Sequence, residues 1–441
     1  MSWIKKGITL NGENVTDRFG RAVTTNADGS IIAVAANGVD FNLKADSGRI
    51  YTYKWDPNLN AYSSFGNSIG GSAIGDGVGF GGIDLSDDGT TLAFGIHTRD
   101  SGVYLNVGKA EIYKYSSSND TWDKIGDILP DTNNDLVDIN KNGEQCGWCV
   151  SLNGLGTRVA VASRYATYET KTRCGRVRVF QYNGNTTWNQ LGQDVSGISI
   201  DDWFGFRVSL NSQGNILAVG APNNSSNTTR PGYAKIYIFS NNRWEQLGQT
   251  LSVSSTSDEF GRCLALNTYG NILAVASNIE NNDGISGAGA VRTYYYNSST
   301  PSTPQWTTFG SPLRGSTQNA NFGFSVSIDG PSADLSGINL TSSNTNLLSG
   351  TTLIVGSQYA QNTSNIGTGA VYIYRYINGN WVLLKTIYGN NSTDIAGFSS
   401  VIKGKTMVYG APSTANNQTG FAEVYNFVEK KTRISGFLSH I

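Results

Sequence analysis

Residues 202–222 read DWFGFRVSLNSQGNILAVGAP, and residues 233–248 read YAKIYIFSNNRWEQLG. Together they hold four short apolar runs separated by polar residues. The run at 216–219 consists of small and branched side chains, whereas the run at 236–239 alternates branched and aromatic ones, which is typical of a strand with two differently packed faces. Gly214 closes the turn between the first two runs, where a short hairpin needs a positive φ. We therefore predict four short antiparallel strands for this unit.

The same unit recurs seven times along the chain. Alignment on the Phe-Gly pairs makes seven glycines equivalent, namely Gly20, Gly81, Gly147, Gly205, Gly261, Gly323 and Gly397. The fourth run of most units opens with tryptophan and closes with glycine, as in Trp244 to Gly248. Self-similarity of this kind is typical of repeat architectures, and a closed array of repeats can form one domain of this length.

The end of the repeat array indicates how the fold closes. The seventh unit ends near Phe427 without a tryptophan run, and the missing copy stands at residues 3–7, which read WIKKG. We expect this N-terminal strand to complete the last blade, because closure removes open sheet edges. The predicted fold is an all-β, seven-bladed β-propeller of four-stranded antiparallel blades. The blades are expected near residues 17–66, 76–126, 144–192, 202–248, 258–310, 320–388, and 394–428 together with 1–10, followed by a C-terminal tail at 429–441.

These units resemble the FG-GAP repeats of integrin α-subunits over nearly the whole chain. The resemblance rests on the Phe-Gly pair, on the Gly-Ala-Pro element at residues 220–222 and 410–412, and on the Val-x-Val-Tyr pattern of the third strand. The units also look like uncharacterised repeats of marine microbes and large DNA viruses. Integrin-type blades often carry a calcium loop, but the turns here lack its carboxylates, and only Asp84, Asp87 and Asp88 come near that pattern. We therefore expect no metal site and no cofactor.

The composition argues against several classes of partner. Charged residues make up 15% of the chain and the formal net charge is −1, so the electrostatic footprint of a nucleic-acid binder is missing. No apolar stretch approaches the roughly 20 residues that membrane insertion requires. The first residues hold no signal-peptide core. We expect four buried free thiols, typical of a reducing compartment, at Cys146, Cys149, Cys174 and Cys263. These features favour a virion or another particle assembled in the cytoplasm, with an extracellular or cell-surface location as the alternative.

Acidic residues recur two positions before the Phe-Gly pair or its replacement in five units. They are Asp17, Glu144, Asp202, Asp258 and Asp394. Such a ring could bind a cation or act on a sugar, but its recurrence favours a structural role, in which each acid accepts backbone N–H bonds of the preceding turn. Arg21, Arg207 and Arg262 lie close to one equivalent position, and a sialidase-like propeller would need an arginine cluster of this kind. The two histidines, His97 and His440, stand too far apart to suggest a metal or triad site.

The variable loops carry the remaining functional signal. In a propeller the loops that join strands two to three and four to one share one face, and loops on a rigid scaffold often carry recognition. Residue types enriched at interfaces occur there at Tyr104, Arg164, Tyr165, Tyr168, Arg173 and Tyr359. On the opposite face, the insert at residues 331–350 offers a docking segment for a neighbouring subunit.

The leading hypothesis from the sequence is a non-enzymatic recognition or assembly module. It would be an exposed structural or attachment component of a virion or cell surface, with protein partners, surface glycans or neighbouring subunits of a larger assembly. A carbohydrate-binding, lectin-like propeller is the alternative. A glycan-processing enzyme that uses the ring of carboxylates is a further alternative.

Overall fold

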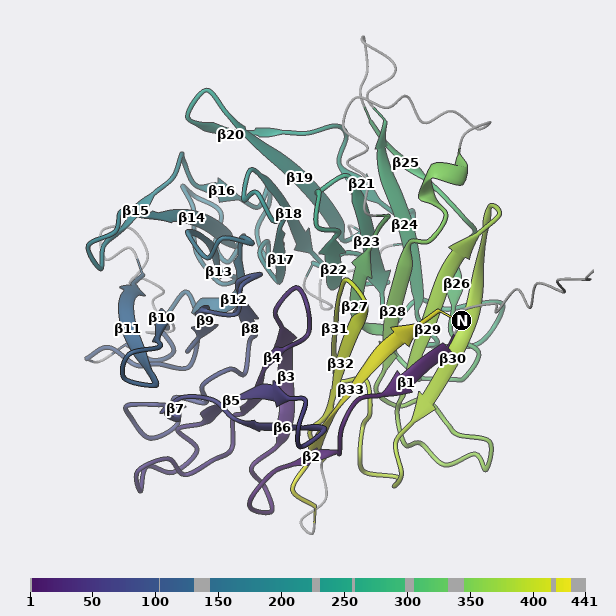
Figure 1. Cartoon of the computed structure of the whole chain (residues 1–441). Helices are drawn as coiled ribbons and strands as arrows, with labels where there is room; N and C mark the ends of the chain where they lie inside the picture. Colours follow the sequence, from purple (N-terminus) through teal and green to yellow (C-terminus); the bar gives the residue numbers. More distant parts are fainter. Residues whose placement is uncertain are drawn as a thin grey trace, which may run out of the picture.

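The computed structural model describes residues 2–102, 104–130, 143–223, 231–255, 258–297, 305–331, 345–413 and 418–429. These residues form seven small antiparallel sheets arranged around a central axis (Figure 1), which confirms the predicted seven-bladed β-propeller. A single 3-10 turn, η1 (Thr345–Leu348), interrupts the β-structure of the described residues. No helix in this part of the chain is long and apolar enough to cross a membrane. Residues 430–441 of the expected tail and 332–344 of the expected insert lie outside the described residues.

The first four blades follow one another along the chain, and their strands are given from the channel outward. Blade one contains β3 (Phe19–Thr25), β4 (Ile31–Ala36), β5 (Arg49–Asp56), β6 (Ala61–Ser64) and β7 (Ile69–Gly70). Blade two contains β8 (Ile83–Leu85), β9 (Thr91–Gly95), β10 (Ala110–Ser116) and β11 (Thr121–Ile128). Blade three contains β12 (Cys146–Leu152), β13 (Arg158–Ser163), β14 (Arg176–Tyr182), β15 (Trp188–Gln190) and β16 (Val195–Ser196). Blade four contains β17 (Arg207–Leu210), β18 (Ile216–Ala221), β19 (Tyr233–Ser240), β20 (Arg243–Gln246) and β21 (Leu251–Ser252).

The last three blades include the one that combines both ends of the chain. Blade five contains β22 (Cys263–Leu266), β23 (Ile272–Ser277), β24 (Ala290–Asn297), β25 (Gln305–Thr308) and β26 (Leu313–Arg314). Blade six contains β27 (Phe322–Asp329), β28 (Thr352–Ser357), β29 (Ala370–Ile377) and β30 (Asn380–Tyr388). Blade seven contains β31 (Ser399–Lys403), β32 (Thr406–Ala411), β33 (Phe421–Val428), β1 (Ser2–Lys5) and β2 (Leu10–Asn11).

The ring closes through the N-terminal strand, as expected. β1 pairs antiparallel with β33, with Trp3 opposite Phe427, and the two strands lie side by side in Figure 1. Lys5 of β1 also forms an ion pair of 2.5 Å with Glu423 of β33. Blade seven therefore has its outer strand supplied by the opposite end of the sequence, and this strand covers the edge of β33.

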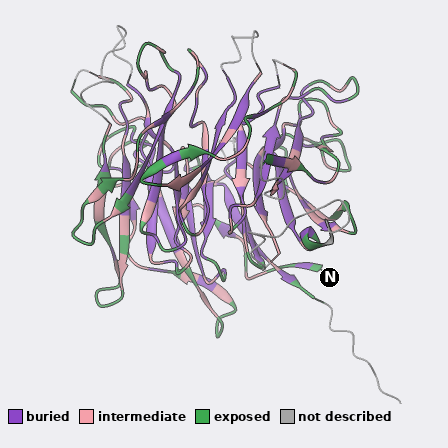
Figure 2. Ribbon diagram, turned by 90° about the horizontal axis from the view of Figure 1, so that it is seen from above, coloured by how far each residue is buried: buried purple, intermediate pink, exposed green. Residues whose placement is uncertain are grey.

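Small residues on the second strands let neighbouring blades pack closely. All six residues of β4, β23, β28 and β32 are buried, and buried strands run through the body of the molecule in Figure 2. A Cβ on Gly220 of β18 would lie 2.0 Å from the carbonyl oxygen of Gly261 in the next blade. No side chain fits in that space, which explains why the second strand ends in glycine or another small residue.

The tryptophans of the outer strands pack between blades. The indole of Trp244 lies against Gly192, which closes the outer strand of the preceding blade, so that a Cβ there would be 2.9 Å from the indole Cδ1. Trp244 also donates its Nε1–H to the carbonyl oxygen of Leu191 at 2.8 Å. Trp306 repeats both contacts with Gly248 and Leu247. The recurring tryptophan and glycine are thus two halves of one inter-blade contact.

Blade two corrects the repeat alignment by two residues. The structural equivalent of Phe19-Gly20 is Val78-Gly79 and not Phe80-Gly81, because Gly79 has φ +77° and Val78 is fully buried between blades. The segment carries two Phe-Gly-like candidates, and only packing against blade one selects between them. Asp76 thereby joins the acidic series as the member from blade two.

Candidate functional site

A cavity opens at one end of the central channel. Its volume is about 560 Å³, and it is lined by the first strands, or the residues just before them, of all seven blades. The position after each repeat glycine supplies one side chain to it. These seven side chains, here called the channel ring, are Arg21, Phe80, Trp148, Phe206, Arg262, Phe324 and Phe398.

The backbone conformation of the repeat directs the channel ring inward. In each blade the repeat glycine has a positive φ, for example +92° at Gly20 and +90° at Gly261. The residue two positions before it also has a positive φ, as at Glu259 with +53°. This double turn buries the intervening phenylalanine between blades and presents the following residue to the channel. The aromatic members contact one another around the ring, with centroid distances of 5.4 Å for Trp148–Phe206 and 4.8 Å for Phe324–Phe398.

Arg21 lies between two phenyl rings of the channel ring. Its guanidinium carbon is 3.9 Å from the Phe80 centroid and 4.3 Å from the Phe398 centroid. Burial, with the nearby charges of Arg18 and Arg207, lowers the pKa of Arg21 to about 10. The Nε of Arg21 is buried and has no hydrogen-bond partner.

Arg207 follows Phe206 and lines the same cavity. Burial lowers the pKa of Arg207, but the thiols of Cys149 and Cys263, from the two flanking blades, hydrogen-bond with its guanidinium and leave the pKa raised. Its Nε is likewise buried without a hydrogen-bond partner. Among the described residues, no carboxylate forms an ion pair with Arg207 or Arg21, so both charges face the cavity without a counter-ion.

Glu259 is the one carboxylate among the described residues that line the cavity. It is 9% exposed, and its Oε2 accepts a hydrogen bond of 2.6 Å from Nη1 of Arg262. Arg262 in turn lies 4.7 Å from the Phe206 centroid. The pair places a carboxylate and a guanidinium next to each other at the cavity wall, with aromatic surface beside them.

Loop residues complete the rim of the cavity. The guanidinium of Arg164 lies 3.3 Å from the Trp148 centroid and donates from Nε to Oε1 of Gln145 at 2.7 Å. Tyr165 stacks against it at 4.4 Å, and Trp203 lies near Tyr165. Burial lowers the pKa of Arg164 to about 10.

His97 sits behind the cavity wall, with ring centroids 4.8 Å from both Phe80 and Trp148. Burial, and then the charges of Arg164 and Arg21, lower the pKa of His97 to about 3. The imidazole is therefore neutral near pH 7 and does not act there as a cationic acid.

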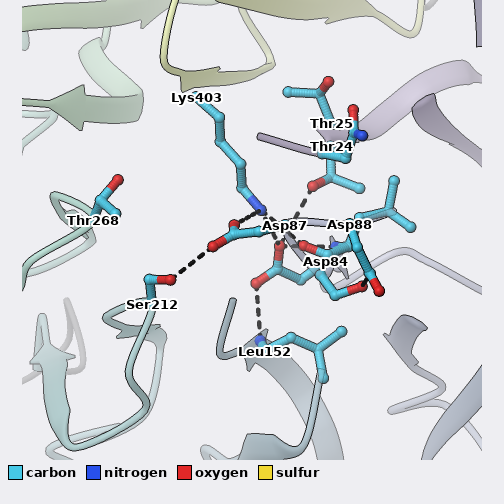
Figure 3. Close-up of polar contacts among 12 residues, drawn as sticks. Thr24, Thr25, Asp84, Asp87, Asp88, Leu152, Ser212, Thr268 and Lys403 are labelled. Atoms are coloured by element: carbon cyan, nitrogen blue, oxygen red, sulfur yellow. Dashed lines mark hydrogen bonds and ion pairs between the residues drawn. The ribbon is translucent and has the colours of Figure 1, made fainter. Parts of the chain in front are cut away.

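The opposite end of the channel is held together by polar contacts between turns (Figure 3). Lys403 of blade seven donates to the carbonyl oxygen of Leu85 at 2.7 Å and lies 3.6 Å from Asp84 and 3.8 Å from Asp87. Asp87 accepts a hydrogen bond from Ser212 of blade four at 2.7 Å. These contacts link blades that are not neighbours, so the cavity is approached from the end that carries the arginines.

The same contacts occupy the three carboxylates that came nearest to a calcium loop. Asp84 accepts the Leu152 amide at 2.9 Å, and Asp88 accepts from Thr90 within its own turn. Among the described residues, no three His, Cys, Asp or Glu side chains gather closely enough to hold a metal ion.

The loop residues singled out in the sequence separate into two groups. Arg164 and Tyr165 line the cavity. Arg173 is instead engaged in an ion pair of 2.7 Å with Asp201, and Tyr168 pairs with Lys171 in a small loop ladder. Tyr104 and the half-exposed Tyr359 also belong to loops away from the cavity lining. Their role in binding stays a prediction.

The acidic series lies in the turns before the first strands and not in the cavity. Asp202 accepts the amides of Ile198 and Ser199, both at 2.8 Å. The other members make comparable turn or ion-pair contacts: Asp17 with the Asn14 amide, Asp76 with the Ser72 and Ala73 amides, Glu144 with Arg176, Asp258 with Ser255, and Asp394 with the Asn390 and Asn391 amides. In these positions the carboxylates hold turns and have no access to a ligand in the cavity.

Sequence reasoning missed most of the cavity wall. Trp148, Trp203, Phe206 and Glu259 were not singled out, although the column after the repeat glycine gave a signal. That column holds arginine in two blades and a large aromatic residue in five, whereas the column before it is glycine in every blade. All four cysteines are buried and free, as expected.

No protein-family model matches the sequence, and no curated protein matches it. Solved structures of similar fold include a protein from Bacteroides uniformis provisionally assigned as a 6-phosphogluconolactonase, with a TM-score of 0.51 and 10% identity over 84% of this chain and 85% of that one. A second such protein from Bacteroides fragilis has a TM-score of 0.49 and 10% identity over 84% and 85%. The periplasmic gluconolactonase of Pseudomonas aeruginosa has a TM-score of 0.49 and 12% identity over the same shares. At these identities the likeness extends to the fold alone.

The expectation of a non-enzymatic recognition or assembly module is corrected by this comparison. A solved propeller of similar architecture carries the name of a lactonase, which is an enzyme. The carboxylate ring that the glycan-processing alternative would use is engaged in turns.

Proposed function

We propose that this protein hydrolyses a sugar lactone bound in the cavity at the open end of the channel. The observation that carries the proposal is the Glu259–Arg262 pair, a carboxylate and a guanidinium 2.6 Å apart on an aromatic-walled cavity. Binding sites for small ligands are concave and combine apolar surface with convergent polar groups. This cavity combines aromatic rings with four arginines and one glutamate.

The roles of the two residues follow from the chemistry of ester opening. Glu259 would accept a proton from a water molecule as the water oxygen attacks the lactone carbonyl carbon. Arg262 would hold Glu259 in place and stabilise the negative charge that develops on the carbonyl oxygen. The carbon–oxygen bond of the ring then breaks, the ring oxygen leaves as an alcohol with the proton from Glu259, and the product is a hydroxy acid.

The aromatic members of the channel ring would bind the sugar itself. Trp148 and Phe206 lie at the cavity wall with centroids 5.4 Å apart, and Arg164 and Arg262 each cover part of them, so the sugar would use the ring faces that these arginines leave uncovered. Such faces pack against the apolar C–H faces of a sugar ring, and their removal from water favours binding. The fold shared with a protein assigned as a 6-phosphogluconolactonase supports a lactone of a sugar acid as the first substrate class to test.

The test is turnover of lactones by the purified full chain. Glucono-δ-lactone and its 6-phosphate would be followed by acid release at constant pH, against the spontaneous rate. We expect acceleration by the parent and a loss of about 100-fold or more in Glu259→Gln, because general-base catalysis contributes factors of this size. Glu245→Gln removes an exposed glutamate of β20 and serves as the matched control.

Two results would contradict the proposal. The first is parental protein that accelerates neither lactone, and the second is Glu259→Gln with the parental rate. A circular dichroism spectrum and a melting temperature equal to those of the parent are required of each variant, so that loss of fold is not read as loss of catalysis.

A further inference from the structure

The side chains that line the cavity carry more positive than negative charge. Four arginines and one glutamate line it among the described residues. Glu259 is engaged by Arg262, and Arg164 is hydrogen-bonded to Gln145. The charges of Arg21 and Arg207 are left without a carboxylate partner.

Both unpaired guanidiniums are partly shielded from water. Arg21 has phenyl rings on its two faces, and Arg207 has thiols beside it. The Nε of each is buried and unpartnered. A buried donor without an acceptor is unfavourable, and the Nε groups of both arginines lack one. The phenyl rings beside Arg21 and the thiols that hydrogen-bond with Arg207 supply no carboxylate counter-charge, so an anion would stabilise both guanidiniums further.

The two charges also act on each other. The charge of Arg207 is one of the causes that lower the pKa of Arg21, which means that the guanidiniums repel one another across the cavity. An anion between them would relieve this repulsion and supply hydrogen-bond acceptors to both. Guanidinium groups suit this task because their planar N–H donors match the oxygens of carboxylates and phosphates.

We propose that Arg21 and Arg207 form an anion subsite, which binds the carboxylate or phosphate of an acidic sugar in the channel cavity. The identity of the sugar as a lactone substrate rests on the proposed function, whereas the anion subsite rests on the two guanidiniums alone. Trp148 and Phe206 would then take the sugar ring, and Glu259 would face the bond to be opened. The preferred substrate is thus an anionic sugar derivative and not a neutral one.

The subsite is tested by equilibrium binding, which needs no turnover. Titration calorimetry of the full chain would use inorganic phosphate, gluconate as the carboxylate probe, glucose 6-phosphate as the phosphate probe, and glucose as the neutral probe. We expect the anionic sugars to bind at least 10-fold more tightly than glucose, and their affinity to fall with added salt. The ratio of gluconate to glucose 6-phosphate affinity assigns the subsite to carboxylate or phosphate.

Substitutions test whether Arg21 and Arg207 bind the anionic group. Arg21→Gln and Arg207→Gln should each weaken the anionic probes about 10-fold or more and leave glucose unchanged, because a charge-assisted pair is lost. Arg243→Gln, which removes an exposed arginine of β20, is the matched control and should bind like the parent. Phosphate should raise the melting temperature of the parent and not that of either variant.

The melting temperatures of the ligand-free variants separate binding from structure. A buried arginine whose charge is compensated only by a bound anion destabilises the ligand-free protein. The ligand-free Arg21→Gln variant should therefore melt at or above the melting temperature of the parent. A lower melting temperature together with unchanged anion affinity would overturn the subsite and assign Arg21 to packing. Equal affinity of the parent for glucose and for the anionic sugars would overturn it as well.

Different results would contradict the anion subsite and the proposed hydrolysis. If anionic sugars bind through Arg21 and Arg207 but no lactone is opened, the proposed reaction is wrong and the subsite stands. If neutral and phosphorylated lactones are opened with the same kcat/KM by the parent and both arginine variants, the reaction stands and the subsite is wrong.

Discussion

The residue that follows each repeat glycine determines the character of the cavity. Its side chain faces the channel because the glycine before it adopts a conformation that other residues rarely take. Arg21 and Arg262 supply charge at this position, and the remaining five blades supply aromatic rings. A regular backbone thus carries an irregular set of side chains, as expected of a binding site built on repeats.

The repeat glycine itself should be intolerant of any side chain. Gly261 has φ +90°, and a Cβ there would lie 2.4 Å from the carbonyl oxygen of Tyr233. We expect Gly261→Ala to lower the free energy of unfolding by about 3 kcal/mol or more, because strain and a steric clash add. Urea denaturation measures this change.

Gly184 provides the control for conformational strain alone. It has φ +92°, but a Cβ there would meet nothing within 4 Å. Gly184→Ala should therefore cost only about 1 kcal/mol. Equal losses in the two variants would show that the close approach between blades contributes nothing to the requirement for glycine.

At the scale of elements, one short strand closes the molecule. β1 has four residues, yet it covers the edge of β33 and brings Trp3 into the core of blade seven. Trp3 is 4% exposed and its ring centroid lies 5.4 Å from that of Phe427. The strand is held by side-chain packing on one face and by pairing along its length.

Substitutions on the two faces of β1 should differ strongly. Trp3→Ala is expected to lower the free energy of unfolding by about 3–5 kcal/mol, since it removes a buried aromatic side chain. Ile4→Ala, on the face that is 53% exposed, should change it by less than about 0.5 kcal/mol. Thermal and urea unfolding check both values, and a mild effect of Trp3→Ala would mean that the ring is closed mainly by other contacts.

At the scale of the whole molecule, the ring is fastened at two places. Lys403 and Asp87 link distant blades at the closed end of the channel (Figure 3). Lys5 and Glu423 link the first strand to the last, where Tyr409 and Tyr425 also donate to the carboxylate at 2.8 and 3.0 Å. The contacts of Lys403 and Asp87 lie at the end of the channel opposite the cavity. The contacts of Lys5 and Glu423 join the two ends of the repeat array.

Closure at Glu423 should make stability depend on pH. Burial raises the pKa of Glu423, but hydrogen bonds from Lys5 and Tyr409 outweigh it and leave the pKa below the usual 4.5. A carboxyl whose folded-state pKa is depressed stabilises the fold above its unfolded pKa, and this contribution is lost as the pH falls through the folded value. We expect the melting temperature of the parent to drop more steeply below about pH 4.5 than that of Glu423→Gln. Identical profiles would exclude a stabilising contribution from this carboxylate, and Glu245→Gln should follow the parent.

The sequence by itself determined the fold class, the blade number and the closure. The signals for these are local: small and branched residues in one run, alternating aromatic residues in the next, and a glycine at each close approach. Trp3 at one end and a blade without its tryptophan run at the other specified the closing strand. Such patterns survive in a linear sequence because each blade is built mainly from contacts within one repeat and with its neighbour.

Only the tertiary structure decided the site. Arg21, Arg207 and Glu259 come from three blades and meet because the ring brings every first strand to one axis, and no spacing along the chain encodes that distance. Packing also chose Val78-Gly79 over the neighbouring Phe80-Gly81 pair, which moved Phe80 from the core into the channel ring. The carboxylates for which the sequence favoured a structural role and left a catalytic one open accept backbone amides of their own turns, as Asp202 and Asp394 do.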